Sequence, residues 1–152
     1  MTPEEVRKKA LSLLEKRDYG SAELTAKLIE KGAESGDAER AAARMVELGF
    51  VNDENYAAMV ARHYAAKGYG AGRVREELRR RKLGRELWDA ALEAMPENDE
   101  SAAAFLRMKM RGRGADRDAL RRAMAALVRR GFGWDEARRA ADSYLAEMET
   151  EE

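Results

Sequence analysis

The chain has 152 residues, about the size of one domain, and its 29 basic and 29 acidic residues leave no net charge that would indicate a polyanionic partner. Hydrophobic residues make up 45%, but much of that is alanine and only 7% of the chain is aromatic, which excludes one thick core and favours thin helical layers. Without cysteine there is no disulfide or thiolate chemistry, and without a secretory signal or an apolar run near the roughly 20 residues of a membrane span we expect a soluble, cytoplasmic protein.

Apolar residues recur at helical spacing along the chain, and strand-like alternation of Val, Ile and Thr is absent. Pro3 lies where a proline can begin a helix, and Pro96 lies where a helix should end. We therefore predict an all-α protein. The expected helices cover approximately residues 3–17, 21–32, 37–49, 53–67, 71–83, 85–95, 99–112, 116–131 and 134–148.

The expected helices fall into three groups of three. Residues 18–32 align with residues 68–84 at an offset of 50, and residues 127–132 resemble residues 28–33 as part of a weaker third copy. Such a period indicates a repeat array, because each unit is too small to bury its apolar face without a neighbour. We predict three tandem three-helix repeats in an elongated, curved array, and a compact all-α bundle is the alternative. The expected repeats are residues 1–50, 51–97 and 98–152.

The chain carries no recognisable catalytic set. His63, the only histidine, lies mid-helix, where a packing or surface role is expected. One histidine without cysteine excludes ordinary zinc sites, and the acidic residues lack the spacing of a calcium loop. The glycine-rich residues 68–72 lack the P-loop pattern and follow a helix, so their role is to turn the chain. We predict a binding protein that is not an enzyme and has no catalytic residue, metal or cofactor.

Positive charge is gathered in two stretches of this neutral chain. Residues 62–85 contain nine basic and two acidic residues, and residues 107–130 contain the same numbers, so each stretch has a net charge of +7. Acidic residues gather elsewhere, including residues 96–100 and the C-terminal tail. This segregation indicates an anionic partner more than overall composition does.

Within the expected helix at 71–83, Arg75, Arg79 and Lys82 follow one another at i, i+4 and i+7, with no acidic residue at a matching spacing. The other two arginines near its end, Arg80 and Arg81, each follow a glutamate by four residues and can pair with it. Like-charge pairs at this spacing each destabilise an isolated helix by a few tenths of a kcal/mol. The alternative is a solvated face, because an arginine stem also covers apolar surface.

The same like-charge spacing recurs in the pairs Arg107–Arg111 and Arg117–Arg121, with further arginines on the glycine-rich corner at 110–117. For the two clusters together we favour binding to a phosphate backbone or an acidic protein surface. No base-reading motif is present, so contact with DNA should be salt-sensitive and largely independent of sequence. The candidate binding residues are Arg73, Arg75, Arg79, Arg80, Lys82, Arg107, Arg111, Arg113, Arg117, Arg121, Arg122, Arg129 and Arg130.

The aromatic residues divide by position. Tyr56 and Tyr64 lie on one helical stripe and are expected in the core, as is Trp88. Trp134 follows a glycine at a helix start, where we expect partial exposure. Tyr69 lies in the loop before the arginine-rich helix, where either a structural or a contact role is open.

Residues 47–92 strongly resemble the RecX family of regulatory proteins, and residues 13–32 and 127–140 also match it. The motifs that carry the resemblance are Gly49-Phe50, Asn52-Asp53-Glu54, Tyr56-Ala57, Lys67-Gly68 with Gly70, and Arg73-Val74 with Glu77-Leu78. Two segments depart from the family pattern. Residues 32–43 are more polar and richer in alanine, and Lys82-Leu83-Gly84 replaces the commoner Lys-Gly-hydrophobic sequence.

The resemblance implies three-helix repeats, in agreement with the period of 50. It also implies binding to the RecA recombinase filament on DNA, within its helical groove, with inhibition of ATP hydrolysis, strand exchange and co-protease activity and thus modulation of DNA repair and the SOS response. The partners would be that filament and DNA, single-stranded or filament-bound and read without sequence preference, and we expect a monomer. The alternatives are a stand-alone, sequence-nonspecific DNA-binding helical protein and a plain helical scaffold.

Overall fold

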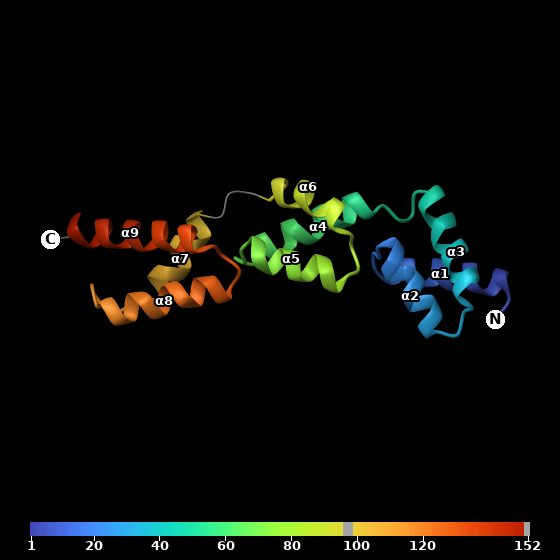
Figure 1. Cartoon of the computed structure of the whole chain (residues 1–152), viewed down its shortest axis with the longest axis horizontal. Coiled ribbons are helices and arrows are strands. Elements are labelled where there is room, and N and C mark those ends of the chain that lie inside the picture. Colours follow the sequence, from blue (N-terminus) through green and yellow to red (C-terminus); the bar gives the residue numbers. More distant parts are fainter. Residues whose placement is uncertain (96–98, 151–152) are drawn as a thin grey trace. The chain divides into compact units, whose positions relative to one another are not determined.

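The computed structural model describes residues 1–95 and 99–150, and these are helical and contain no strand, which confirms the all-α prediction (Figure 1). Each expected helix is found with its ends within three residues of the predicted ones. Pro96 and the predicted boundary at residue 97 lie outside the described residues. The elements are α1 (Pro3–Lys16), α2 (Ser21–Glu30), α3 (Ser35–Glu47), α4 (Asp53–Ala66), α5 (Ala71–Arg80), the short 3-10 turn η1 (Arg85–Leu87), α6 (Trp88–Glu93), α7 (Asp99–Lys109), α8 (Arg117–Arg129) and α9 (Trp134–Thr150).

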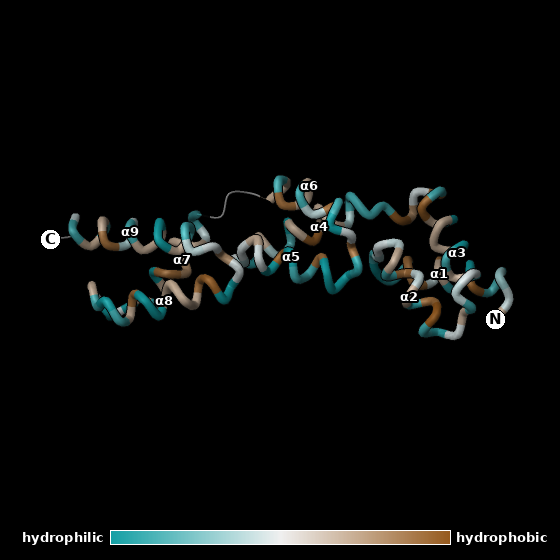
Figure 2. Tube along the Cα trace, viewed as in Figure 1, coloured by the Kyte–Doolittle hydropathy of each residue, from teal (hydrophilic) through white to brown (hydrophobic). Residues whose placement is uncertain are grey.

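The helices α1, α2 and α3 pack against one another around a core of their own (Figure 1). The chain enters α1 through Thr2, whose hydroxyl accepts a hydrogen bond from the backbone N–H of Glu5 at 3.2 Å, with Pro3 as the first helical residue. Each helix turns its apolar side inward, and Figure 2 shows hydrophobic and hydrophilic residues alternating along all three. The largest fully buried side chains of this core are Val6, Leu24, Leu28 and Met45.

The helices α7, α8 and α9 also pack against one another, around a second core of buried apolar residues. Leu106, Met110 and Leu127 are almost wholly buried there, and Met124 and Val128 pack against them from the side. Alanines line much of α9 where it enters this core, so the helices approach closely and little large apolar surface is needed. That arrangement fits the low content of large apolar residues in the sequence.

Contacts along the chain gather into two compact units, residues 1–59 with 78–91 and residues 60–77 with 92–152. We call α4, α5 and α6 the central segment, and the three helices before it and the three after it the outer groups. Each unit contains one outer group and part of the central segment, because the division passes through α4 and α5. The three repeat boundaries therefore stay a prediction. Within each unit, however, residues of the central segment hold the outer group through specific hydrogen bonds.

One feature recurs at the ends of α2, α5 and α8, the second helices of the three predicted groups. The N–H two residues past the C-cap donates to the carbonyl of the third-last helical residue, which is the Schellman arrangement. The donors and acceptors are Ala33 to Leu28 at 3.0 Å, Leu83 to Leu78 at 3.0 Å and Phe132 to Leu127 at 3.1 Å. The three acceptor leucines are fully buried, so equivalent positions of the predicted repeats share both backbone geometry and core placement.

The residue between C-cap and donor must have a positive φ in this arrangement, a conformation that glycine adopts without steric cost. Gly32 has φ 110° and Gly131 has φ 104° at this position. The central copy has Lys82 with φ 60°, the sole non-glycine residue with a positive φ in residues 1–95 and 99–150. The departure at Lys82-Leu83-Gly84 is thus a lysine in a left-handed conformation.

Candidate functional site

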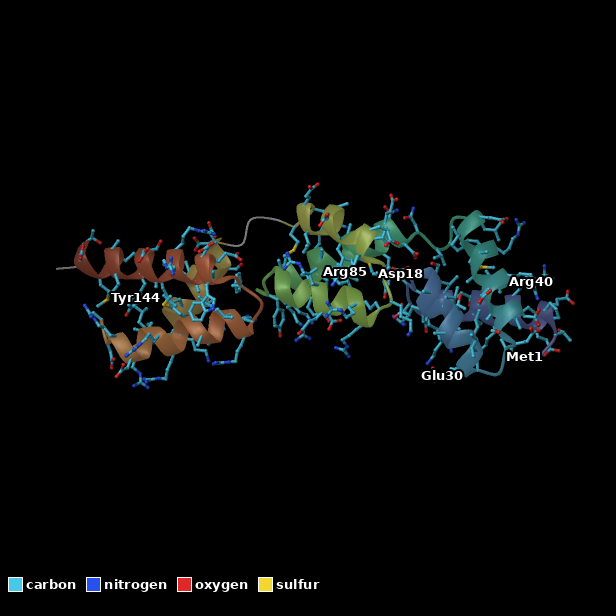
Figure 3. The ribbon with its side chains drawn as sticks, in the orientation of Figure 1. Met1, Asp18, Glu30, Arg40, Arg85 and Tyr144 are labelled. Carbon is cyan, nitrogen blue, oxygen red and sulfur yellow. The ribbon has the colours of Figure 1, made fainter. Side chains whose placement is uncertain are left out.

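Two exposed arginines, Arg79 and Arg85, lie against the indole of Trp88, and the exposed Lys82 lies between them in the chain. We call Arg79, Lys82 and Arg85 the Trp88 cation cluster. Arg79 and Arg85 each place the guanidinium carbon 5.4 Å from the Trp88 ring centroid, and Figure 3 labels Arg85. Trp88 itself is buried, as predicted, and its Nε1 donates to the carbonyl oxygen of Leu83 at 3.0 Å. None of the three cations has an ion pair with any residue that the structure describes.

The predicted row of cations on this helix is partly wrong. Because α5 ends at Arg80, Lys82 lies past the helix in a left-handed turn and does not continue the helical spacing. Arg75 is exposed on α5 and, among the described residues, has no ion-pair partner, as predicted. Arg85 was missed by the sequence reasoning, which considered spacing within one helix. Its position three residues before Trp88, at the start of the next helical segment, was the available signal.

Arg73 and Arg130 are candidates that the chain itself engages. The guanidinium of Arg73 donates to Glu77 Oε1 at 3.3 Å and lies 5.1 Å from the Tyr69 ring centroid. Arg130 donates from Nε to the Gly68 carbonyl oxygen at 2.9 Å and packs 4.2 Å from the centroid of the same tyrosine. These two arginines and Tyr69 therefore join the end of α8 to the turn before α5, and Tyr69 has a structural role.

Two further candidates pair with carboxylates of the same chain. Arg107 forms ion pairs with Glu100 at 3.1 Å and Glu147 at 3.5 Å, and Arg121 pairs with Asp118. The prediction that these like-charge rows are unrelieved is wrong for Arg107 and Arg121. The relief of Arg107 comes partly from 40 residues along the chain, which local spacing does not reveal.

The remaining candidates are exposed. Arg80 lies on the solvent side of α5. Five others, on or beside α8, have no ion pair with a carboxylate in residues 1–95 or 99–150. These five are Arg111, Arg113, Arg117, Arg122 and Arg129.

The buried hydroxyl of Tyr56 joins the first group of helices to the central segment. It accepts a hydrogen bond from Arg81 Nη1 at 2.8 Å and donates to Glu23 Oε1 at 3.1 Å, while Arg17 pairs with that carboxylate at 3.1 Å. Burial raises the pKa of Tyr56, and the hydrogen bond from Arg81 opposes this rise. Beside it, the Asp53 carboxylate accepts from the backbone N–H of Ser21 at 2.7 Å. This polar network holds Arg81, the residue that follows α5, to α2 and α4.

The only histidine of the chain and the remaining aromatic residues differ in exposure. His63 is exposed, with its ring edge-on to Tyr64 at 5.3 Å, and Trp134 is 55% exposed, as predicted. Tyr56 is buried as expected, whereas Tyr64 is half-buried. Within the described part of the chain, no three His, Cys, Asp or Glu residues come together as a metal site. Nor does any helix there have the length and apolar character to cross a membrane.

The sequence of this chain matches one family of known proteins. A family model described as "RecX, second three-helix domain" matches residues 52–92, which hold α4, α5 and α6. Regulatory protein RecX of Stenotrophomonas maltophilia (strain R551-3) is 36% identical over 134 residues, covering 87% of this chain and 82% of that protein. Regulatory protein RecX of Pseudomonas fluorescens (strain SBW25) is 41% identical over 87 residues, covering 57% of this chain and 56% of that protein.

Solved structures share the fold. The crystal structure of RecX from Lactobacillus salivarius has a TM-score of 0.81 at 17% identity, covering 97% of both chains. A second crystal structure of regulatory protein RecX has a TM-score of 0.79 at 20% identity, covering 92% of this chain and 71% of that one. At such low identity these likenesses concern the arrangement of helices and not individual side chains.

Proposed function

The chain belongs to the RecX family of regulatory proteins, and we propose that it regulates a RecA recombinase by binding the recombinase–DNA filament in its helical groove. Bound there, it would inhibit ATP hydrolysis, strand exchange and co-protease activity, and so modulate DNA repair and the SOS response. A regulator acts on such a filament only through unequal affinity for two of its states. We propose a cytoplasmic monomer that uses no cofactor and catalyses no reaction.

The observation that carries this proposal is the Trp88 cation cluster. Its three cations are exposed without a carboxylate partner in the described part of the chain, although the chain has as many acidic as basic residues. Like charges gathered without compensation repel one another, and an anionic surface relieves that repulsion on binding. DNA phosphates and acidic recombinase side chains both supply such a surface. The stacking of Arg79 and Arg85 on Trp88 holds the two guanidinium groups in place before binding, which lowers the entropic cost of the complex.

The test is recombinase ATP hydrolysis on single-stranded DNA across a range of concentrations of this protein. We expect turnover to fall to a plateau, and the triple variant Arg79→Glu, Lys82→Glu, Arg85→Glu to require a much higher concentration. The control reverses three exposed cations of α1, Arg7, Lys8 and Lys16, with the same change in net charge. Unchanged turnover at saturating protein contradicts the proposal. Equal loss in both triple variants shows that net charge, and not this cluster, matters.

The second candidate is a DNA-binding protein that acts without a recombinase, and the unpaired arginines of α8 favour it. A salt titration on bare single-stranded DNA separates the two. Tight binding that filaments do not strengthen supports independent DNA binding. Weak binding that strengthens on recombinase filaments supports the filament regulator.

A further inference from the structure

A cleft between the end of α7 and the outer side of α8 is walled by cations and floored by alanines, and we call it the α7–α8 cleft. Its volume is about 210 Å³. All of its residues belong to one compact unit of the fold. Figure 3 shows several side chains that end in nitrogen along α8. The walls are Lys109, Arg113, Arg122 and Arg129, and the floor is Ala119, Ala123 and Ala126.

No carboxylate lines the α7–α8 cleft, and its four cations have no ion pair with a residue that the structure describes. Asp116 forms no ion pair with Arg113 or Arg122, although its charge interacts with both. Its Oδ1 caps α8, accepting from the backbone N–H groups of Asp118 at 2.9 Å and Ala119 at 3.2 Å. Lys109 is held 5.5 Å from the centroid of a neighbouring phenylalanine ring. The cleft therefore presents an excess of positive charge, four cations with one carboxylate beside them, which an apolar or cationic ligand would not match.

The floor determines how closely a ligand approaches. Ala119, Ala123 and Ala126 recur at i, i+4 and i+7, so one side of α8 carries only methyl groups between its arginines. Larger side chains there would occupy the cleft. The cleft lining has no aromatic ring to stack on a base and no amide to read one. A ligand is thus recognised by its charge and width and not by a base.

The length of the site favours a polymer over a single anion. Arg122 and Arg129 are seven residues apart on one helix, which is about 10.5 Å along the axis. Successive phosphates of a strand can each meet one of these guanidinium groups, which a single phosphate can do only if both side chains bend towards it. Guanidinium forks also match phosphate oxygens in bidentate hydrogen bonds.

We propose that the α7–α8 cleft binds the phosphate backbone of a single nucleic-acid strand without reading its sequence. This inference rests on the DNA-binding part of the proposed function and assigns it a place that includes Lys109, which the sequence reasoning missed. In this proposal the strand runs along α8 with its phosphates over the alanine floor. Lys109 at the end of α7 and Arg113 in the following turn line one side of the strand, and Arg122 and Arg129 of α8 line the other. Binding displaces counterions from the strand and is therefore salt-dependent.

The experiment is fluorescence anisotropy of a labelled single-stranded oligonucleotide with the full chain, without recombinase, over a series of salt concentrations. For Arg122→Gln with Arg129→Gln, we expect affinity to fall on the order of tenfold per lost charged contact. The slope of log affinity against log salt should fall by about 1.4, since each single-strand phosphate contact contributes about 0.7. The matched control, Arg62→Gln with Arg138→Gln, removes the same charge from the same unit outside the cleft and should change both quantities much less.

A second variant tests the cleft itself. Ala126→Phe changes no charge but fills the floor at a half-buried position, and circular dichroism with thermal unfolding verifies that the fold is kept. We expect weaker strand binding from this variant. Parental binding by Ala126→Phe, equal weakening by the control pair, or stronger competition by an acidic peptide than by unlabelled strand each overturns the inference. If the cleft variants bind bare strand normally while recombinase ATP hydrolysis is still inhibited, the inference fails and the proposed function stands.

Discussion

Lys82 carries a side chain where the corresponding positions of the other two predicted repeats have glycine. Its φ is 60°, against 110° for Gly32 and 104° for Gly131. For an L-residue a left-handed conformation costs roughly 1–2 kcal/mol, because Cβ approaches the following carbonyl oxygen. Retaining a lysine under that strain makes sense if its charge serves the Trp88 cation cluster.

The perturbation is the pair of variants Lys82→Gly and Lys82→Ala, which both remove the charge and differ only in Cβ. Glycine removes the strain of roughly 1–2 kcal/mol, but it also gives the unfolded chain about 0.4–1 kcal/mol of extra conformational freedom. The difference leaves Lys82→Gly more stable than Lys82→Ala by about 1 kcal/mol. For a chain of this length that is about 2–4 °C in Tm.

The assay is chemical and thermal unfolding of both variants together with their inhibition of recombinase ATP hydrolysis on single-stranded DNA, which reports binding to the filament. We expect the two variants to differ in stability while sharing the same weakened binding, because strain and charge are separate properties of Lys82. The control is Gly32→Ala, whose added Cβ has space around it, with the nearest atom 4.0 Å away. It should lose about 1 kcal/mol from the same conformation alone. If Lys82→Ala is as stable as Lys82→Gly, or if either inhibits the recombinase like the parent, the reasoning about Lys82 is refuted.

The other predictions concern the joints of the fold. Gly131→Ala should cost about 3 kcal/mol or more in urea unfolding, because its Cβ would lie 2.5 Å from the backbone nitrogen of Arg73, whereas Gly49→Ala, with open space around it, should cost about 1 kcal/mol. Tyr56→Phe should lower the free energy of unfolding by about 1 kcal/mol, since it leaves two partly buried partners, Glu23 and Arg81, without the hydroxyl; an unchanged midpoint would contradict this. Hydrogen bonds from backbone amides lower the pKa of Asp116 below its ordinary 3.8, so its contribution to stability is present above that pH and is lost as pH falls through the folded-state pKa. Acid unfolding curves of Asp116→Asn should lack this loss.

The helices and the equivalent turns that end α2, α5 and α8 were predictable because they depend on local signals. Apolar spacing, capping residues and glycines are signals that extend over about ten to fifteen residues. From them every helix end was predicted to within three residues. The offset of 50 correctly paired Leu24 with Val74 and Leu28 with Leu78, all fully buried in the structure. Apolar residues that recur at equivalent positions of the two aligned segments are buried in both, and this recurrence can be read from a single sequence.

The pairing of charges was not predictable in the same way. The Arg107–Glu147 ion pair spans 40 residues, and Arg139 pairs with Asp99 across a similar separation at 3.2 Å. Such partners become neighbours only when helices pack, so spacing along one helix overestimated the free charge near Arg107. The helix end before Lys82 was missed for a related reason: the stop signal in the other copies is a glycine, and here a lysine adopts the same backbone conformation.

The comparison of equivalent turns shows why one position accepts a lysine and another does not. At Gly131 an added Cβ would lie 2.5 Å from the backbone nitrogen of Arg73. Gly72 also donates its N–H to the Gly131 carbonyl oxygen at 2.9 Å. Glycine is therefore required there by packing as well as by φ. At Lys82 the side chain is exposed, and only the conformational cost remains. A cost of that size is easily offset by one charged contact with a partner, so this turn, unlike the one at Gly131, can accept a binding residue without loss of the fold.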